Sequence, residues 1–203
     1  MEKLPRQEAQ KVDPEEETQR QGKEPERRPP AMSKEDAANL ESFRKQVLSK
    51  GCPGAFPIPI AVSVVGYEDI NGGQDVLLHY NHIKDLTWTN EGGAWDGISN
   101  FVAPCPGLYY FAMTFVKDPT YNNGTTDDVS VWITKNGKYI VYAWAGENDC
   151  THSVKTQTDR GTGATHVILR LKIGDIIQTH VGSDSGRPWY IRNFNFSGHR
   201  IGP

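Results

Sequence analysis

One stretch near the middle of the chain, FVAPCPGLYYFAMTF at residues 101–115, constrains the fold most strongly. A Pro-Cys-Pro-Gly segment separates its two apolar runs. The two prolines lack the backbone donor that a β-ladder needs, and Gly107 accepts backbone angles that other residues resist, so the chain must turn there. The second run, from Leu108 to Phe115, is rich in aromatic residues and carries no charge, which predicts a strand covered on both faces. Since such a strand would aggregate if left uncovered, the rest of the chain must cover it.

Length and charge limit the classes of protein that this sequence fits. The chain has 203 residues and a formal net charge of -3, which indicates one ordinary domain with an appendage. The first 50 residues hold 11 of the 25 acidic and 11 of the 22 basic residues, so the remaining 14 acids and 11 bases carry the whole net charge. Without a basic surplus, nucleic acid is not expected as a partner. No apolar run approaches about 20 residues, so we expect no membrane span.

The cysteines and the start of the chain bear on the cellular compartment. Three cysteines, at positions 52, 105 and 150, are too few for a disulfide-dense scaffold and lack the paired spacing of a zinc site. The opening residues, MEKLPR, contain no apolar core and do not form a secretory signal. A cytosolic protein, export by another route and a missing N-terminus all remain open.

The N-terminal quarter of the chain divides into a charged tail, a short helix and a hinge. The tail, residues 1–32, has almost nothing to bury and is predicted to be disordered. A helix is predicted over 33–50, because Ser33 can cap it and acids occupy its first turn. Its three apolar residues, Leu40, Phe43 and Val47, align on one face. Alone it would be marginal, so it either pairs with copies from other chains as a coiled-coil stem, or docks on its own domain or frays. The segment 51–57 reads as a hinge before a globular part over 58–203.

From residue 58 onward the pattern is one of short strands and turns, with no useful helical period. The segment Lys135-Asn-Gly-Lys138 is the strongest hairpin signal in the chain. About ten short strands at this spacing predict an all-β fold, an antiparallel sandwich or jelly roll. In the strand after Gly107, alternate residues face opposite sides, so one set can fill the sandwich and the other would leave aromatic area exposed on a monomer.

Four segments of the globular part, taken in order, resemble a known family. They are Asn90, Gly93 and Trp95-Asp96 leading into Phe101-x-Ala-Pro-x-Pro-Gly-Leu-Tyr-Tyr-Phe111, then Lys135-Asn-Gly137, Leu169-x-Leu-x-x-Gly-Asp175, and Phe196-Ser-Gly198. Their order and spacing resemble the signature of the globular head of complement component one, subcomponent q, whose fold is shared with the tumour-necrosis-factor cytokines. The signature residues are Trp95, Phe101, Pro104, Gly107, Tyr109, Tyr110, Phe111, Gly174, Asp175, Phe196 and Gly198.

The resemblance implies a ten-stranded antiparallel jelly roll that assembles as a homotrimer. It implies a secreted, non-enzymatic module that binds proteins or microbial surface carbohydrates, as in innate immunity and lectin-like recognition. The sequence departs from the family where Trp95 replaces the usual tyrosine, Asn100 replaces a glycine, and His199-Arg200 replace an apolar ending. A charged tail and a short helix also stand in place of a collagen stem.

Candidate ligand contacts lie in three polar loops, at 118–127, 146–163 and 182–188. These loops hold polar and aromatic residues that the core does not need. Tyr121, Arg187 and Trp189 are the candidates within or beside them, with local packing as the other interpretation of each.

Three further positions carry specific predictions. Asp159 is the nearest match to the loop carboxylates with which some heads of the family bind calcium, an ion that prefers oxygen ligands; ordinary solvated acids are the alternative. Asn123 begins a glycosylation triplet in an exposed loop. Cys52 stands just before the domain, where three chains would converge, so an interchain disulfide is predicted if the protein is extracellular. Three reduced thiols remain the alternative.

Other functional classes remain as alternatives. A receptor ligand of the tumour-necrosis-factor type would share the fold, and an intracellular adaptor would suit the absent signal. A carbohydrate-active jelly-roll enzyme would need two facing carboxylates about 5–10 Å apart. The sequence shows no nucleophile elbow, phosphate-cradling loop or metalloprotease helix, so we expect no enzyme.

Overall fold

The computed structural model describes residues 32–52, 61–66, 70–72, 76–80, 89–117, 120–121, 124–125, 129–145, 161–183 and 189–203. Within these ranges the elements are α2 (Lys34–Lys50), β1 (Ala61–Gly66), β2 (Ile70–Gly72), β3 (Val76–Leu77), β4 (Thr89–Glu91), β5 (Phe101–Val102), β6 (Gly107–Lys117), β7 (Thr120–Tyr121), β8 (Gly124–Thr125), β9 (Val129–Lys135), β10 (Lys138–Ala145), β11 (Gly161–Leu171), β12 (Ile176–Gly182) and β13 (Trp189–Gly202).

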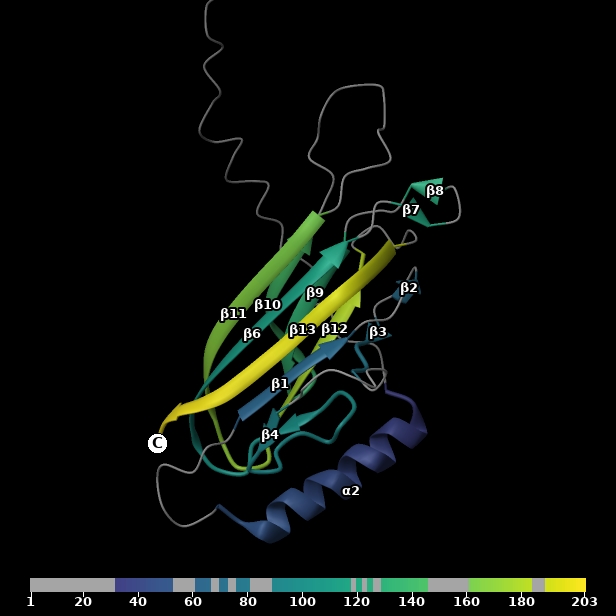
Figure 1. Cartoon of the computed structure of the whole chain (residues 1–203). Helices are drawn as coiled ribbons and strands as arrows, with labels where there is room; N and C mark the ends of the chain where they lie inside the picture. Colours follow the sequence, from purple (N-terminus) through teal and green to yellow (C-terminus); the bar gives the residue numbers. More distant parts are fainter. Residues whose placement is uncertain are drawn as a thin grey trace, which may run out of the picture.

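The strands form two antiparallel sheets packed face to face (Figure 1). The first, sheet A, has the order β11-β6-β13-β1-β4, with β2 also paired to β13. The second, sheet B, has the order β10-β9-β12-β3, with β5 also paired to β12. Strands β7 and β8 pair only with each other among the described residues. The predicted all-β, antiparallel jelly-roll sandwich is confirmed.

Strand β6 is the centre of sheet A, as its sequence predicts. It pairs with β11 along its whole length and with β13 on its other side. Tyr109, Phe111 and Phe115 point between the sheets and are fully buried. The intervening residues point outward from sheet A and are half-buried or exposed. The core therefore collects the aromatic side chains of one face of β6, where each buried ring stabilises the fold by roughly 1.5–3 kcal/mol.

Two glycines let neighbouring strands receive the rings of β6. A side chain at Gly198 on β13 would overlap the ring of Phe111, and one at Gly163 on β11 would overlap the ring of Phe115. Both pairs lie in register across the strands. The rings lie where Cβ atoms at positions 163 and 198 would stand if these residues had side chains. Sheet A therefore packs closely on both sides of β6.

Several strands differ from the sequence prediction at their ends. Strand β11 begins at Gly161, within the loop predicted at 146–163, and β13 runs unbroken from Trp189 to Gly202. Its residues do not all alternate cleanly because the register with β6 shifts at two places. The hairpin at Asn136–Gly137 forms as predicted, with both residues at positive φ.

Helix α2 crosses one end of the sandwich, which we call the base (Figure 1). Ser33 caps it by accepting a hydrogen bond from the Asp36 backbone amide at 3.0 Å. Val47 is 2% exposed, while Leu40 and Phe43 are half-buried. The side chains of Leu48 and Arg44 lie against Gly174. The apolar face of the helix therefore lies against its own domain in this chain, which is the second of the two arrangements that the sequence left open.

The predicted interchain disulfide at Cys52 is wrong in this structure. Cys52 is bonded to Cys105 of the same chain, across a Cα–Cα distance of 4.9 Å. The physical reason is the path of α2, which folds back across the base and ends beside the Pro-Cys-Pro turn. The sequence alone does not pair the two cysteines, since 53 residues separate them. Cys150 lies outside the described residues.

Candidate functional site

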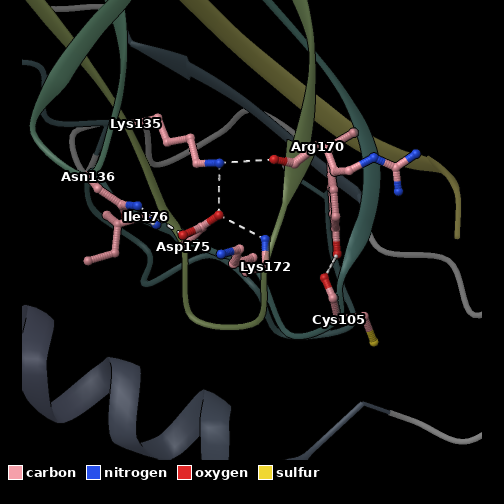
Figure 2. Close-up of polar contacts among 8 residues, drawn as sticks. Cys105, Lys135, Asn136, Arg170, Lys172, Asp175 and Ile176 are labelled. Atoms are coloured by element: carbon pink, nitrogen blue, oxygen red, sulfur yellow. Dashed lines mark hydrogen bonds and ion pairs between the residues drawn. The ribbon is translucent and has the colours of Figure 1, made fainter.

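Two signature segments meet at the base of the sandwich in one polar network (Figure 2). The Lys135 ammonium lies 2.9 Å from Asp175 Oδ2 and donates to the Arg170 carbonyl at 2.9 Å. Asn136 Nδ2 donates to Asp175 Oδ1 at 2.9 Å, and its own Oδ1 accepts from the Ile176 amide. We call Lys135, Asn136 and Asp175 the signature network.

The carboxylate of Asp175 is the centre of this network. Its Oδ2 also accepts from the Lys172 backbone amide at 2.8 Å. Burial by itself would raise the pKa of Asp175, but the hydrogen bonds from Asn136, Lys172 and Lys135, with the charge of Lys135, hold that pKa below its usual value. The network ties the β9–β10 hairpin to the β11–β12 turn, so its role is structural.

The first signature segment forms a second group of structural hydrogen bonds. Asn90 and the Trp95 backbone exchange two hydrogen bonds, at 3.0 and 3.1 Å. The Asp96 carboxylate accepts from the backbone amides of Ile98, Ser99 and Asn100. These contacts close the turn that leads into Phe101. The polar residues quoted for the resemblance therefore shape turns.

The remaining signature residues belong mainly to the core. Trp95, Phe101, Tyr109, Phe111 and Phe196 are at most 3% exposed, and Pro104, Gly107, Gly174 and Gly198 are buried. Tyr110 differs, because it points outward from sheet A. Its ring lies 6.0 Å from that of His166 and 5.4 Å from that of His199. It is therefore the one aromatic of the signature that is placed to meet another molecule.

The three loops predicted to contact a ligand leave the sandwich at the same end. The strand ends flanking them are Lys117, Val129, Ala145, Gly161, Gly182 and Trp189, and the pairing registers place these together, opposite α2. We call this end the apex. Tyr121 lies in β7, and Trp189 is the first residue of β13. Arg187, Asp159 and Asn123 lie outside the described residues.

A buried lysine at the apex escaped the sequence analysis. Lys117 ends β6 and is 1% exposed, on the same side of the strand as Phe115. The sequence signal was present, since the inward alternation of β6 continues to position 117.

Two neighbouring rows on the outward face of sheet A are uncharged, although Arg170 of β11 and Glu91 of β4 lie beyond them on the same face. Reading across β11, β6 and β13, one row holds Ile168, Tyr110 and His199, and the next holds His166, Ala112 and Ser197. Within these rows no side chain is an acid, a lysine or an arginine. We call these six residues the sheet A face.

An apolar edge adjoins that face. Ile140, Tyr142 and Trp144 point outward from β10 and are 42%, 61% and 48% exposed, and Ile168 of β11 is 58% exposed. The two strands lie close, because small residues meet there, with Ala145 beside Gly161. We call these four residues the β10–β11 edge. Sequence reasoning missed it, although 139–145 is apolar at nearly every position, the same signal that marked β6.

The described residues contain no grouping of three or more histidine, cysteine or acidic side chains that could hold a metal ion. No helix in the described part of the chain has the length and apolar character needed to cross a membrane.

Comparison with known proteins gives a match at the level of structure only. No model of a known protein family matches the sequence, and no curated protein does. Among solved structures, the globular domain of zebrafish complement 1qA protein is similar with a TM-score of 0.51 and 14% identity, over 70% of this chain and 97% of that chain. Murine APRIL at pH 5.0 has a TM-score of 0.49 and 8% identity, over 70% and 99%. Eiger TNF from S. frugiperda has a TM-score of 0.45 and 10% identity, over 70% and 92%. The chain therefore has the jelly-roll fold of the complement 1qA globular domain.

Proposed function

We propose that this protein is a non-enzymatic recognition module that works as a homotrimer and binds a protein or carbohydrate ligand through its apex. The observation that carries the proposal is that the sheet A face and the β10–β11 edge lie next to each other on the same chain. Both are rich in apolar or aromatic side chains, and they adjoin at β11.

Two different surfaces that adjoin on one chain allow copies of the chain to assemble into a closed ring. In a heterologous contact, one surface of each copy meets another surface of the next, and the ring closes if the rotation allows it. Ile168 belongs to both surfaces, so a contact of the edge of one copy with the sheet A face of the next would bury it. Large apolar side chains gathered on an exposed surface usually mark a contact of this kind.

The arrangement of strand ends supports recognition at the apex. The three predicted loops leave from that end, while α2 covers part of the base. A trimer would present three copies of each loop side by side. Binding one ligand through several copies strengthens attachment without any new type of contact.

The disulfide supports a secreted protein over a cytosolic adaptor. Cys52 and Cys105 are bonded within the chain, and such bonds persist mainly in oxidising compartments. Calcium bound through Asp159 stays a proposal, to be tested together with assembly.

The test is the solution mass of the full chain, by size-exclusion chromatography with light scattering, in calcium and in a calcium chelator. We expect a mass three times that of the chain. Ile168→Lys should shift the mass to that of one chain. Ile173→Lys is the matched control, because Ile173 is 45% exposed but lies on the turn at the base; it should remain trimeric.

A single-chain mass for the unmodified protein at tens of micromolar would overturn the trimer. A trimer that Ile168→Lys leaves intact would overturn the assigned surfaces. A mass that depends on the chelator would support a calcium site, and an unchanged mass would remove calcium from any role in assembly.

A further inference from the structure

The end of helix α2 is attached covalently to the base of the head. The helix ends at Lys50, and Cys52 follows after one glycine. Cys105, to which it is bonded, is 1% exposed and belongs to the core. Its carbonyl accepts a hydrogen bond from the buried Tyr109 hydroxyl at 2.8 Å. The anchor point is therefore rigid, whereas its partner is an exposed residue at a helix end.

The non-covalent attachment of α2 is slight by comparison. Val47 is its only fully buried residue. Among the described residues, the ion pairs of α2 join Glu41 to Arg44 and to Lys45 and so lie within the helix. One weak hydrogen bond, from Gln178 Nε2 to Met32 Sδ at 3.5 Å, links the described residues beside its start to sheet B. Leu40 and Phe43 are half-buried, and the side chains of Leu48 and Arg44 lie against Gly174. Since most helical stability in proteins comes from tertiary packing, a helix with one fully buried residue is held weakly without the covalent bond.

We propose that the Cys52–Cys105 disulfide is a thiol-sensitive latch that decides whether α2 lies against the base or is released from it. With the bond intact, the helix end is fixed at its docking position. With the bond reduced, only residues 53–60 join it to β1. Without the bond, one chain connection instead of two keeps the helix near its site, and its effective concentration there falls. The latch is independent of the trimer proposed above.

The chemistry requires a reductant, for which a small dithiol is the class we name. One of its thiolates attacks the exposed Cys52 sulfur, since Cys105 is shielded. A bond forms to Cys52, the bond to Cys105 breaks, and Cys105 leaves as a thiolate that takes up a proton. The second thiol of the reductant then loses its proton and displaces Cys52. Two electrons and two protons pass from the dithiol to the two cysteines, and the dithiol becomes a cyclic disulfide.

Hydrogen–deuterium exchange of the full chain tests the latch, with labelling times under a minute and with or without millimolar dithiothreitol. On reduction, we expect the amides of 37–50 to exchange at least about tenfold faster, while those of β6 and β13 stay protected. Cys52→Ser should show the same fast exchange without reductant. It should fold, because position 52 is exposed. Cys150→Ser removes a cysteine outside this bond and should behave as the unmodified chain.

Three results would overturn the latch. Slow exchange of α2 in the reduced chain would show that its non-covalent contacts suffice. Equal loss of protection in α2, β6 and β13 would show that the bond holds the whole domain and not the helix. A Cys52–Cys105 bond that millimolar dithiothreitol leaves intact in the native protein, as read by alkylation and mass spectrometry, would show that it does not switch.

Discussion

Asp175 shows what a single signature residue contributes. Its carboxylate joins a lysine and an asparagine on the β9–β10 hairpin to a backbone amide in the next turn. The side chains of Lys135 and Asp175 are 26% and 13% exposed. Water therefore screens this pair less than a surface pair, and losing the carboxylate would leave several donors unpaired.

We predict that Asp175→Ala lowers the free energy of unfolding by roughly 2–4 kcal/mol. Urea denaturation followed by tryptophan fluorescence measures it. The control is Lys172→Ala, because Lys172 uses only its backbone amide in the network; its effect should stay within about 0.5 kcal/mol. Equal effects of the two substitutions would contradict the role given to the carboxylate.

His180 makes stability depend on pH. It is 2% exposed on β12, and neither ring nitrogen has a hydrogen-bond partner among the residues that the structure describes. Burial lowers its pKa from 6.5 to about 4. Between these values the unfolded chain binds a proton that the folded chain does not. Stability is therefore full above pH 6.5 and falls as the pH drops toward 4, by roughly 3 kcal/mol in total.

We predict that His180→Leu flattens this decline between pH 7 and pH 4, when unfolding is measured in urea across the range. His79→Gln is the matched control, since His79 is only half-buried and lies outside the proposed trimer contacts; it should leave the decline in place. The Asp175 contribution is separate, because its lowered pKa removes stability only at more acid pH, below the ordinary 3.8. An unchanged slope in His180→Leu would contradict the prediction.

At the scale of elements, β6 depends on its neighbours having no side chain at two positions. The rings of Phe111 and Phe115 lie where Cβ atoms at Gly198 and Gly163 would stand. A close-packed core cannot absorb an added methyl group there without moving a ring or a strand.

We predict that Gly198→Ala lowers the free energy of unfolding by roughly 1–3 kcal/mol. Combining it with Phe111→Leu should recover part of the loss, because the smaller side chain makes room. The same double variant made with Phe115→Leu should be additive, since Phe115 lies over Gly163. Denaturant titration of the three single and two double variants gives the coupling. If the effects are additive in both pairs, the contact between position 198 and the Phe111 ring does not explain the loss of stability.

At the scale of the whole molecule, the exposed apolar side chains link folding to assembly. Tyr142 and Ile168 are 61% and 58% exposed on one edge, next to the uncharged rows of the sheet A face. If copies cover these side chains for one another, folding and assembly are linked, and dilution must weaken both.

We predict that the midpoint of thermal unfolding falls by roughly 3 °C for each tenfold dilution of the full chain. The reason is that three unfolded chains form from one trimer. Ile168→Lys should show a lower midpoint that dilution does not change. Scanning fluorimetry over three decades of concentration measures both. A midpoint independent of concentration in the unmodified protein would argue against a trimer that is coupled to folding.

The sequence by itself determined the fold class and the local turns. The uncharged aromatic run at 108–115 had to lie inside a sandwich, and Asn136-Gly137 had to turn a hairpin, because these outcomes depend on neighbours along the chain. It also marked the helix from Ser33, with Leu40, Phe43 and Val47 on one face.

Only the tertiary structure decided where those elements meet. The pairing of Cys52 with Cys105, the docking of α2 on the base, and the joining of Lys135 and Asn136 to Asp175 all link residues far apart in the chain. The exposure of Tyr142 could not be predicted either, since the sequence of an apolar strand does not tell whether its second face meets the core or solvent. Alternation along a strand tells which residues share a face, and long-range packing decides what that face touches.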